Sequence, residues 1–135
     1  MSQEDVQAFT RCAEAFRRRD IDAVLEELDA AVEWHDALPM LLGGERTVFR
    51  GHEGVRELQR ELWEALDEIQ AEFAEIRDLG DRIVATGRLR TRGRGSGIEM
   101  ESPYGVVADY ADRKATLVWT YLDSAEALEA AGLEK

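Results

Sequence analysis

The chain has 135 residues, a length that fits one domain with a sizeable buried core. Its 29 acidic residues outnumber its 17 basic ones, which gives a formal net charge of −12 at pH 7. This charge works against binding to nucleic acid or to an anionic membrane surface. We therefore expect residues 1–135 to form a single domain whose partner is a small molecule.

Cysteine content and hydropathy indicate the compartment. Cys12 is the only cysteine, so no disulfide can form within the chain. The sequence has no long apolar run and no secretory leader ahead of its first predicted helix. These features favour the reducing cytoplasm.

Two helices are predicted in the first part of the chain. Apolar residues recur every three or four positions from Val6 to Phe16, with Cys12 on the same side, and predict an amphipathic helix. It ends at three arginines, 17–19, which complement the helix dipole; an anion-binding patch is the alternative. Asp20 can cap a second, short helix. Its buried side consists of Ile21, Val24, Leu25 and Leu28.

A strand is predicted over residues 31–36. Residues two apart on a strand share a face, so Trp34 and Asp36 point to the same side. If that face lines a cavity, Asp36 is a carboxylate in apolar surroundings, which raises its pKa and suits it to act as a general base. His35 points to the opposite side and is interpreted as a surface or interface residue.

The segment 37–44 lacks a regular period and is interpreted as a loop, because it contains Pro39 and two glycines. Its apolar residues Met40 and Leu41 suit the rim of a pocket, either as a lid over a ligand or as a plug for the core. A short strand over 46–50 then leads to a longer amphipathic helix over 53–68. The apolar side of that helix includes Trp63 and Ile69.

The second half of the sequence predicts an antiparallel meander and a short final helix that Ser124 caps. The strands are expected over 73–79, 83–92, 98–109 and 116–122, with turns between them. Charge pairing across the glycine-rich turn at 93–96 sets the register of the middle hairpin. It places Arg90 opposite Glu99, Arg88 opposite Glu101, Leu89 beside Met100 and Ala85 beside Tyr104.

Alternation assigns the strand residues to two faces of the sheet. The predicted pocket face carries Ile98, Met100, Tyr104, Leu117, Trp119 and Tyr121. The predicted outer face has an apolar component that consists of Val84, Val107, Val118 and Thr120.

The order of elements predicts an α+β fold with helices on one face of a curved sheet. A bent sheet wrapped around helices leaves a cone-shaped cavity, and such cavities are the usual sites for small molecules. Asp36 is the candidate base, and Tyr104 and Tyr121 are candidate hydrogen-bond donors. The candidate pocket residues are Cys12, Phe16, Trp34, Met40, Leu41, Trp63, Met100 and Trp119.

Four stretches carry a family resemblance: residues 15–22 leading to 32–36, then 49–55, 93–97 and 121–128. Together they resemble the SnoaL-like, ketosteroid-isomerase-like group of the nuclear-transport-factor-2-like (NTF2-like) superfamily. The resemblance covers nearly the whole chain. It implies a curved, mainly antiparallel sheet wrapped around the N-terminal helices, with an internal pocket, and a homodimer through the outer sheet face.

The resemblance also places individual residues. Asp36 falls where ketosteroid isomerases carry the base that moves a proton next to a carbonyl. Cys12 falls where they carry an oxyanion-stabilising tyrosine, and Val106 where they carry a neutral aspartic acid. A thiol is a weak donor and valine is none, so the oxyanion site of those isomerases is missing.

Two functions remain open, because this superfamily includes isomerases, cyclases, hydrolases and proteins without known activity. One is a cofactor-independent enzyme in which Asp36 moves a proton on an apolar carbonyl compound such as a polyketide or terpenoid. The other is a non-catalytic module for ligand binding or dimerisation. His35, His52 and Cys12 are not grouped with carboxylates in the sequence, so no metal and no cofactor is expected.

Overall fold

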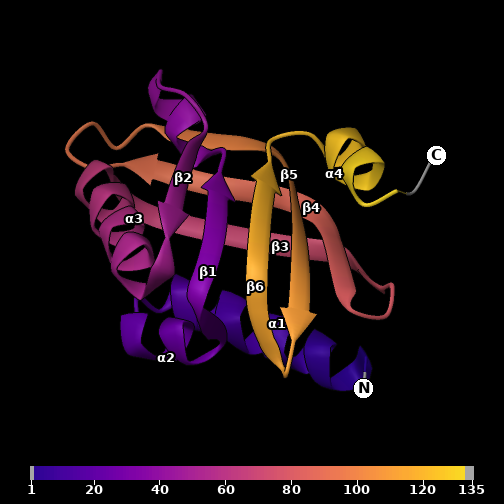
Figure 1. Ribbon diagram of the computed structural model, residues 1–135. Coiled ribbons are helices and arrows are strands. Elements are labelled where there is room, and N and C mark those ends of the chain that lie inside the picture. The colour runs from indigo at the N-terminus through magenta and orange to yellow at the C-terminus, as the bar shows by residue number, and fades with distance from the viewer. Residues whose placement is uncertain (1, 133–135) are drawn as a thin grey trace.

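The computed structural model describes residues 2–132 and has the predicted α+β architecture (Figure 1). Its elements in chain order are α1 (Ser2–Arg17), α2 (Ile21–Glu26), β1 (Leu28–Asp36), the 3-10 helix η1 (Leu38–Leu42), β2 (Thr47–Arg50), α3 (Gly51–Ala65), β3 (Leu66–Asp78), β4 (Arg82–Gly93), β5 (Glu99–Ala111), β6 (Lys114–Tyr121) and α4 (Ser124–Ala130). None of the helices in this part of the chain is long and apolar enough to cross a membrane.

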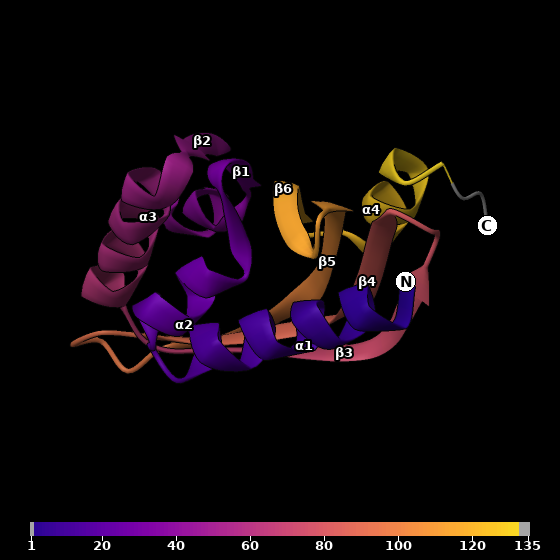
Figure 2. The same cartoon turned by 60° about the horizontal axis from the view of Figure 1, so that its bottom comes forward.

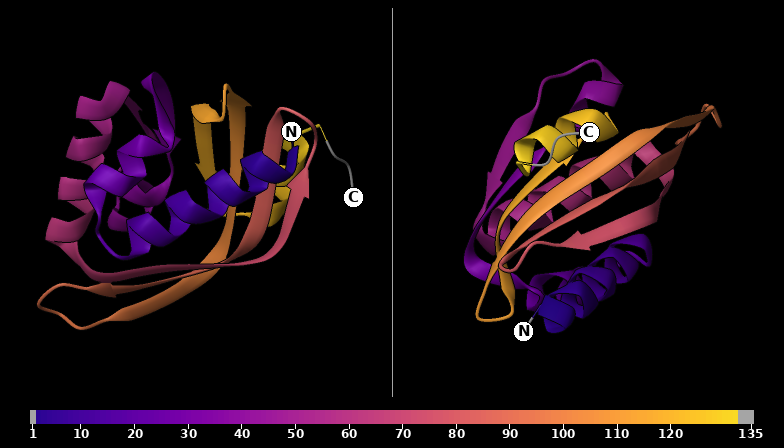
Figure 3. Two further views of the ribbon diagram at one scale, coloured as in Figure 1. Left: turned by 90° about the horizontal axis from the view of Figure 1, so that it is seen from below. Right: turned by 90° about the vertical axis from the view of Figure 1, so that its right-hand side faces the viewer.

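A single six-stranded sheet has the strand order β2-β1-β6-β5-β4-β3. Strands β1 and β6 pair in parallel, and all other neighbours pair antiparallel. The long strands β3, β4 and β5 bend, and α1 lies along β3 on the inner face of the sheet (Figures 2 and 3). Helix α3 packs beside β1 and β2 at the other end. The sheet is therefore curved around its helices, as predicted.

Helix ends follow from local residues. The Asp20 side chain accepts a hydrogen bond from the Ala23 backbone N–H and caps α2, as predicted. Two predicted helices were too long, because Leu28 lies in β1 and Ile69 lies in β3. Leu66 already has an extended backbone, with φ −127°. Pairing with β4 from this residue onward overrides a spacing that fits a helix. The predicted loop 37–44 contains the short helix η1.

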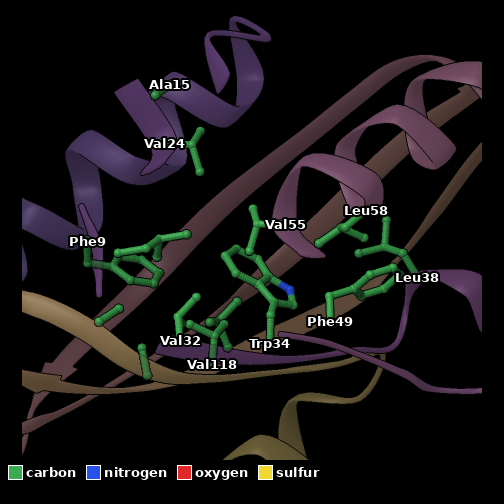
Figure 4. Close-up of a cluster of buried hydrophobic side chains, with 14 of the residues drawn as sticks. Phe9, Ala15, Val24, Val32, Trp34, Leu38, Phe49, Val55, Leu58 and Val118 are labelled. Atoms are coloured by element: carbon green, nitrogen blue, oxygen red, sulfur yellow. The ribbon is translucent and has the colours of Figure 1, made fainter. Parts of the chain in front are cut away.

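The core lies between the inner face of the sheet and helices α1, α2 and α3. Strand β4 contributes the face predicted from its alternation, with Ile83, Ala85 and Leu89 fully buried. Figure 4 shows the Trp34 side chain within this core, together with Val55 of α3. The Trp34 ring thus fixes β1 against the helical layer.

The register of the β4–β5 hairpin differs by two residues from the prediction. Arg90 pairs with Glu101 instead of Glu99. The connection is longer than predicted, because the Gly93 backbone N–H donates to the Ile98 carbonyl and closes a loop between them. The other predicted pairs shift in the same way: Arg88 lies opposite Pro103, Leu89 opposite Ser102 and Ala85 opposite Val106. A shift of two leaves every side chain on its predicted face.

A β-bulge in β6 reverses the predicted faces of that strand. One step along β5 corresponds to two steps along β6, from Ala115 to Leu117, so Thr116 is an extra residue. Beyond the bulge, Val118 and Thr120 are buried on the inner face. The prediction for this strand was therefore wrong, since a one-residue slip moves all side chains to the other face. The residues displaced from the predicted pocket face are Leu117, Trp119 and Tyr121.

Helix α4 covers part of the outer sheet face. Val84 and Val107 are buried beneath Ala127 of this helix and Ala131, the residue that follows it. A Cβ atom at Gly105 would lie only 2.5 Å from the Ala127 Cβ, so the helix approaches β5 closely. Val84 and Val107 thus lie on the outer face as predicted but are covered by α4, whereas the prediction was wrong for Val118 and Thr120, which face inward.

Candidate functional site

An apolar cavity lies between α1 and the inner face of the sheet. Its aromatic walls come from α1, β1, β3 and β5, and consist of Phe9, Phe16, Trp34, Phe73, Tyr104 and Tyr110. The Phe16 and Trp34 rings stack with centroids 6.3 Å apart, and Phe9 and Phe73 lie 5.3 Å apart. The residues around it that can donate or accept a proton or hydrogen bond are Cys12, Arg17, Asp36, Tyr104, Tyr110 and Thr120.

Asp36 lies at the end of β1 and is 1% exposed. Its Oδ1 accepts from Trp34 Nε1 at 3.0 Å and from Thr120 Oγ1 at 3.1 Å, and its Oδ2 accepts from the Leu38 backbone N–H at 3.2 Å. Burial raises the pKa of Asp36 to about 6, although these hydrogen bonds act in the opposite direction. Each carboxylate oxygen can accept two hydrogen bonds, so Oδ2 keeps one position for a proton.

Thr120 links Asp36 to a tyrosine. Its hydroxyl accepts from the Ala37 backbone N–H at 2.8 Å and donates to Asp36 at 3.1 Å, and its proximity to Tyr104 lowers the pKa of that phenol by less than burial raises it. Burial, and next the nearby Asp36 carboxylate, raise the pKa of Tyr104. Tyr104 is therefore a neutral phenol that can donate a hydrogen bond inside the cavity.

The structure brings together five of the residues singled out in the sequence and separates them from six others. Cys12, Phe16, Trp34, Asp36 and Tyr104 line the cavity. Met40, Leu41, Trp63, Met100, Trp119 and Tyr121 are not among its lining residues.

Each displaced residue has a physical reason. Met40 is 48% exposed on η1, and Met100 is 44% exposed on the part of β5 that extends beyond the cavity. Trp63 packs against the core from α3, with the Arg19 guanidinium 3.8 Å from its ring centroid. Leu41 is half-buried against the core. Trp119 and Tyr121 point outward because of the bulge, so Tyr121 cannot donate into the cavity.

Thr120 is the polar residue that sequence reasoning missed, because it was assigned to the outer face. Residues 115–118 lack strict alternation of polar and apolar types, which is a signal of the bulge. Phe73 and Tyr110 were also missed as cavity residues: Phe73 begins a predicted strand, whereas Tyr110 lies one residue beyond the predicted end of another and belongs to β5. Side-chain direction along a bent strand depends on packing that no local pattern encodes.

The outer face opposite Asp36 carries an aromatic stack. The His35 and Trp119 rings lie 3.8 Å apart and are nearly parallel, and Trp119 stacks on Tyr121 at 6.3 Å. His35 Nε2 lies 3.1 Å from Glu33 Oε1. His35 therefore points away from the cavity, as its place on the strand predicts.

Other polar groups near the helices have partners within the protein. Arg17 bonds to Glu14 at 2.8 Å, and Arg19 donates to the Asp67 carbonyl. His52 Nε2 lies 3.0 Å from the Leu28 carbonyl. Within residues 2–132, no three histidine, cysteine, aspartate or glutamate side chains are grouped to hold a metal ion.

Comparison with solved structures finds the same fold. An NTF2-like protein of unknown function from Burkholderia pseudomallei is 25% identical, with 93% of this chain and 95% of that chain covered and a TM-score of 0.80. TerC, co-crystallised with polyporic acid, is 24% identical over 93% and 96% of the chains, with a TM-score of 0.79. A protein with a ketosteroid-isomerase-like fold from Catenulispora acidiphila, in complex with trimethylamine, is 14% identical over 93% and 92%, with a TM-score of 0.75.

Sequence comparison gives the family. No curated protein matches the chain. Residues 7–118 match the SnoaL-like domain, which is most of the chain. The chain therefore belongs to the SnoaL-like family and has the NTF2-like fold.

Proposed function

We propose that this protein is a small, cofactor-independent enzyme that moves a proton on an apolar carbonyl compound, with Asp36 as the general base. The observation that carries the proposal is the buried Asp36 carboxylate at the wall of an aromatic cavity, with its pKa raised to about 6. Such a base is mostly ionised at pH 7, yet it is a stronger proton acceptor than an exposed aspartate. The apolar walls favour a ligand of the same character.

The geometry supports a specific division of roles. Trp34 and Thr120 both donate to Oδ1 and hold the carboxylate in place, while Oδ2 takes a proton from the carbon next to a carbonyl. The electron pair of the broken C–H bond moves onto the carbonyl oxygen, and the neutral Tyr104 hydroxyl donates to this developing charge. Asp36 then returns its proton to another atom of the ligand, which completes an isomerisation.

A second candidate is a non-catalytic binding module, because Asp36 already has a structural role. Its carboxylate accepts from Trp34, Thr120 and the Leu38 backbone, and so joins β1 to β6 and to η1. Under this alternative the cavity binds an apolar ligand without converting it. Asp36 then serves only to hold the end of β1 in place as part of the cavity wall.

Two measurements test the proposal. Native mass spectrometry of the purified protein identifies any retained ligand, and a panel of conjugated ketones related to it is then assayed for isomerisation or cyclisation. We expect Asp36→Asn to lower kcat by roughly 100-fold or more. Glu33→Gln, on the outer face of the same strand, is the matched control and keeps its activity. Unchanged turnover in Asp36→Asn contradicts a catalytic role, and binding without turnover in the native protein favours the second candidate.

A further inference from the structure

The parallel ladder between β1 and β6 ends one residue before the candidate base. The last paired residues are His35 and Trp119. Beyond them the Ala37 backbone N–H bonds to the Thr120 hydroxyl instead of to a backbone carbonyl. The backbone carbonyl of Thr120 accepts instead from the guanidinium of Arg46. Next to the candidate base, side-chain hydrogen bonds thus take the place of backbone hydrogen bonds between β1 and β6.

Arg46 is held on the outer side of the sheet. Its guanidinium carbon lies 5.3 Å from the Trp119 ring centroid and 4.9 Å from the Tyr121 ring centroid, within cation–π distance of both. The residue is half-buried and lies between η1 and β2. These contacts and the bond to the backbone carbonyl of Thr120 fix the guanidinium outside the cavity.

The segment from Ala37 to Arg46 is therefore tied to β6 at both ends. At its start the Ala37 N–H bonds to the Thr120 hydroxyl, and at its end Arg46 bonds to the carbonyl of the same residue. Loss of the second contact removes one of the two hydrogen bonds that hold this segment against Thr120, whose hydroxyl donates to Asp36. Arg46 thus acts on the site through Thr120.

The charge of Arg46 also reaches Asp36. Its positive charge lowers the pKa of Asp36 and so opposes the larger effect of burial. The other ionisable groups that line the cavity are Arg17 and the neutral side chains of Cys12, Tyr104 and Tyr110, and His35 with its partner Glu33 lies on the opposite face of β1.

We infer that Arg46, which lies outside the cavity, is a positioning residue that fixes Thr120 against Asp36 and supplies the positive charge that favours the Asp36 carboxylate. Its importance for turnover rests on the proposed function of Asp36. Its effect on the ionisation of Asp36 needs no substrate, so the two ideas can fail separately.

Three variants separate the charge of Arg46 from its hydrogen bond. Arg46→Lys keeps the charge, and Arg46→Gln keeps a donor for the Thr120 carbonyl but loses the charge. Arg46→Met keeps only apolar contact with the two rings. Arg50→Gln is the matched control, because Arg50 is an exposed arginine of β2 that pairs with Glu33 at 3.6 Å.

The test is a carbon-13 NMR titration of the Asp36 carboxyl group, with the melting temperature measured in parallel. Loss of one nearby charge is expected to raise the pKa of Asp36 by roughly half a unit or more in Arg46→Gln and Arg46→Met. Arg46→Lys and Arg50→Gln are expected to titrate close to the wild type. If the protein is an active enzyme, the pKa of the acidic limb in its profile of kcat/KM against pH should shift by the same amount as the pKa of Asp36.

An unchanged Asp36 titration in Arg46→Gln overturns the inference, even if the melting temperature falls, because a purely structural residue gives that result. If Arg46→Met does not fold, the Asp36 titration of Arg46→Gln compared with the wild type is sufficient to test the inference. A shifted titration in a protein that turns over no substrate supports the role of Arg46 and counts against the proposed function.

Discussion

The Thr120 hydroxyl lies 3.1 Å from Oδ1 of Asp36 and directs its only proton to that carboxylate. The oxygen of this hydroxyl accepts from the Ala37 backbone N–H at 2.8 Å, which leaves its proton for Asp36. The two residues are 84 positions apart in the sequence. The orientation of the candidate base is thus set by a strand from the other end of the chain.

Thr120→Val tests this relationship with little change in side-chain volume. The pKa of Asp36 should rise above about 6, since a hydrogen bond that stabilises the charged form is lost. The Ala37 N–H also loses its partner, so the free energy of unfolding should fall by about 1–3 kcal/mol. Urea unfolding and a carboxyl titration measure both effects. Thr116→Val, at the half-buried bulge residue of the same strand, is the control and should leave the Asp36 titration unchanged.

The buried Asp36 should make stability depend on pH in a defined direction. Burial raises its pKa from 3.8 to about 6, so the fold favours the protonated form relative to the unfolded chain. The contribution of Asp36 to stability is therefore fully present below about pH 4 and is lost as the pH rises through about 6. A shift of about two units corresponds to roughly 3 kcal/mol.

Asp36→Asn isolates this contribution, because asparagine does not titrate. Between pH 4 and pH 7.5, the stability of the wild type should fall relative to this variant by about 2–3 kcal/mol. Urea unfolding of both proteins at the two pH values measures the difference and cancels the effect of other groups. Parallel stability profiles of the two proteins would contradict a raised pKa at Asp36.

Gly87 of β4 should not tolerate a side chain. A Cβ atom there would lie 1.9 Å from the carbonyl oxygen of Glu72, at the point where β3 bulges after Phe73. The Glu72 carbonyl belongs to the paired backbone of β3 and cannot move aside as a flexible side chain can. Gly87→Ala should therefore destabilise the protein by roughly 3 kcal/mol or more. Thermal unfolding followed by circular dichroism measures this. Thr86→Ala, one residue earlier, is the control, and equal stability of the two variants would argue against the close approach.

We expect a homodimer through the part of the outer face that α4 leaves uncovered. The half-exposed rings of Trp119 and Tyr121 provide large apolar area there, next to His35. Sedimentation velocity at micromolar concentration should show a dimer that Trp119→Ala weakens. Met40→Ala, at an exposed apolar residue on η1, should not change the association, and a monomeric wild type would contradict the expectation.

Local patterns predicted most of the fold. The three- and four-residue spacing along α1 and the alternation along β4 follow from helix and strand geometry, so they appear directly in the sequence. The same alternation placed Trp34 and Asp36 on one face, and both line the cavity. The strand start at Leu66 was missed, because tertiary pairing decides between helix and strand there.

The candidate site was predicted less well, because it depends on contacts between distant strands. Asp36 could be identified from its own strand, whereas its partner Thr120 depends on the phase of β6 after the bulge. Hydrogen bonds from Leu38 and Ala37 also depend on how η1 returns over the strand ends. Such contacts have no local signature.

The bulge in β6 decides which side chains of this strand face the cavity. If Thr116 took the regular place opposite Asp109 and no bulge formed, the side chains that follow would exchange sides. Two large aromatic rings, Trp119 and Tyr121, would enter the cavity, and Thr120 would leave Asp36. Deleting Thr116 would instead leave Leu117 opposite Asp109 and Thr120 opposite Val106, so the chain could lose this residue and still keep Thr120 beside Asp36.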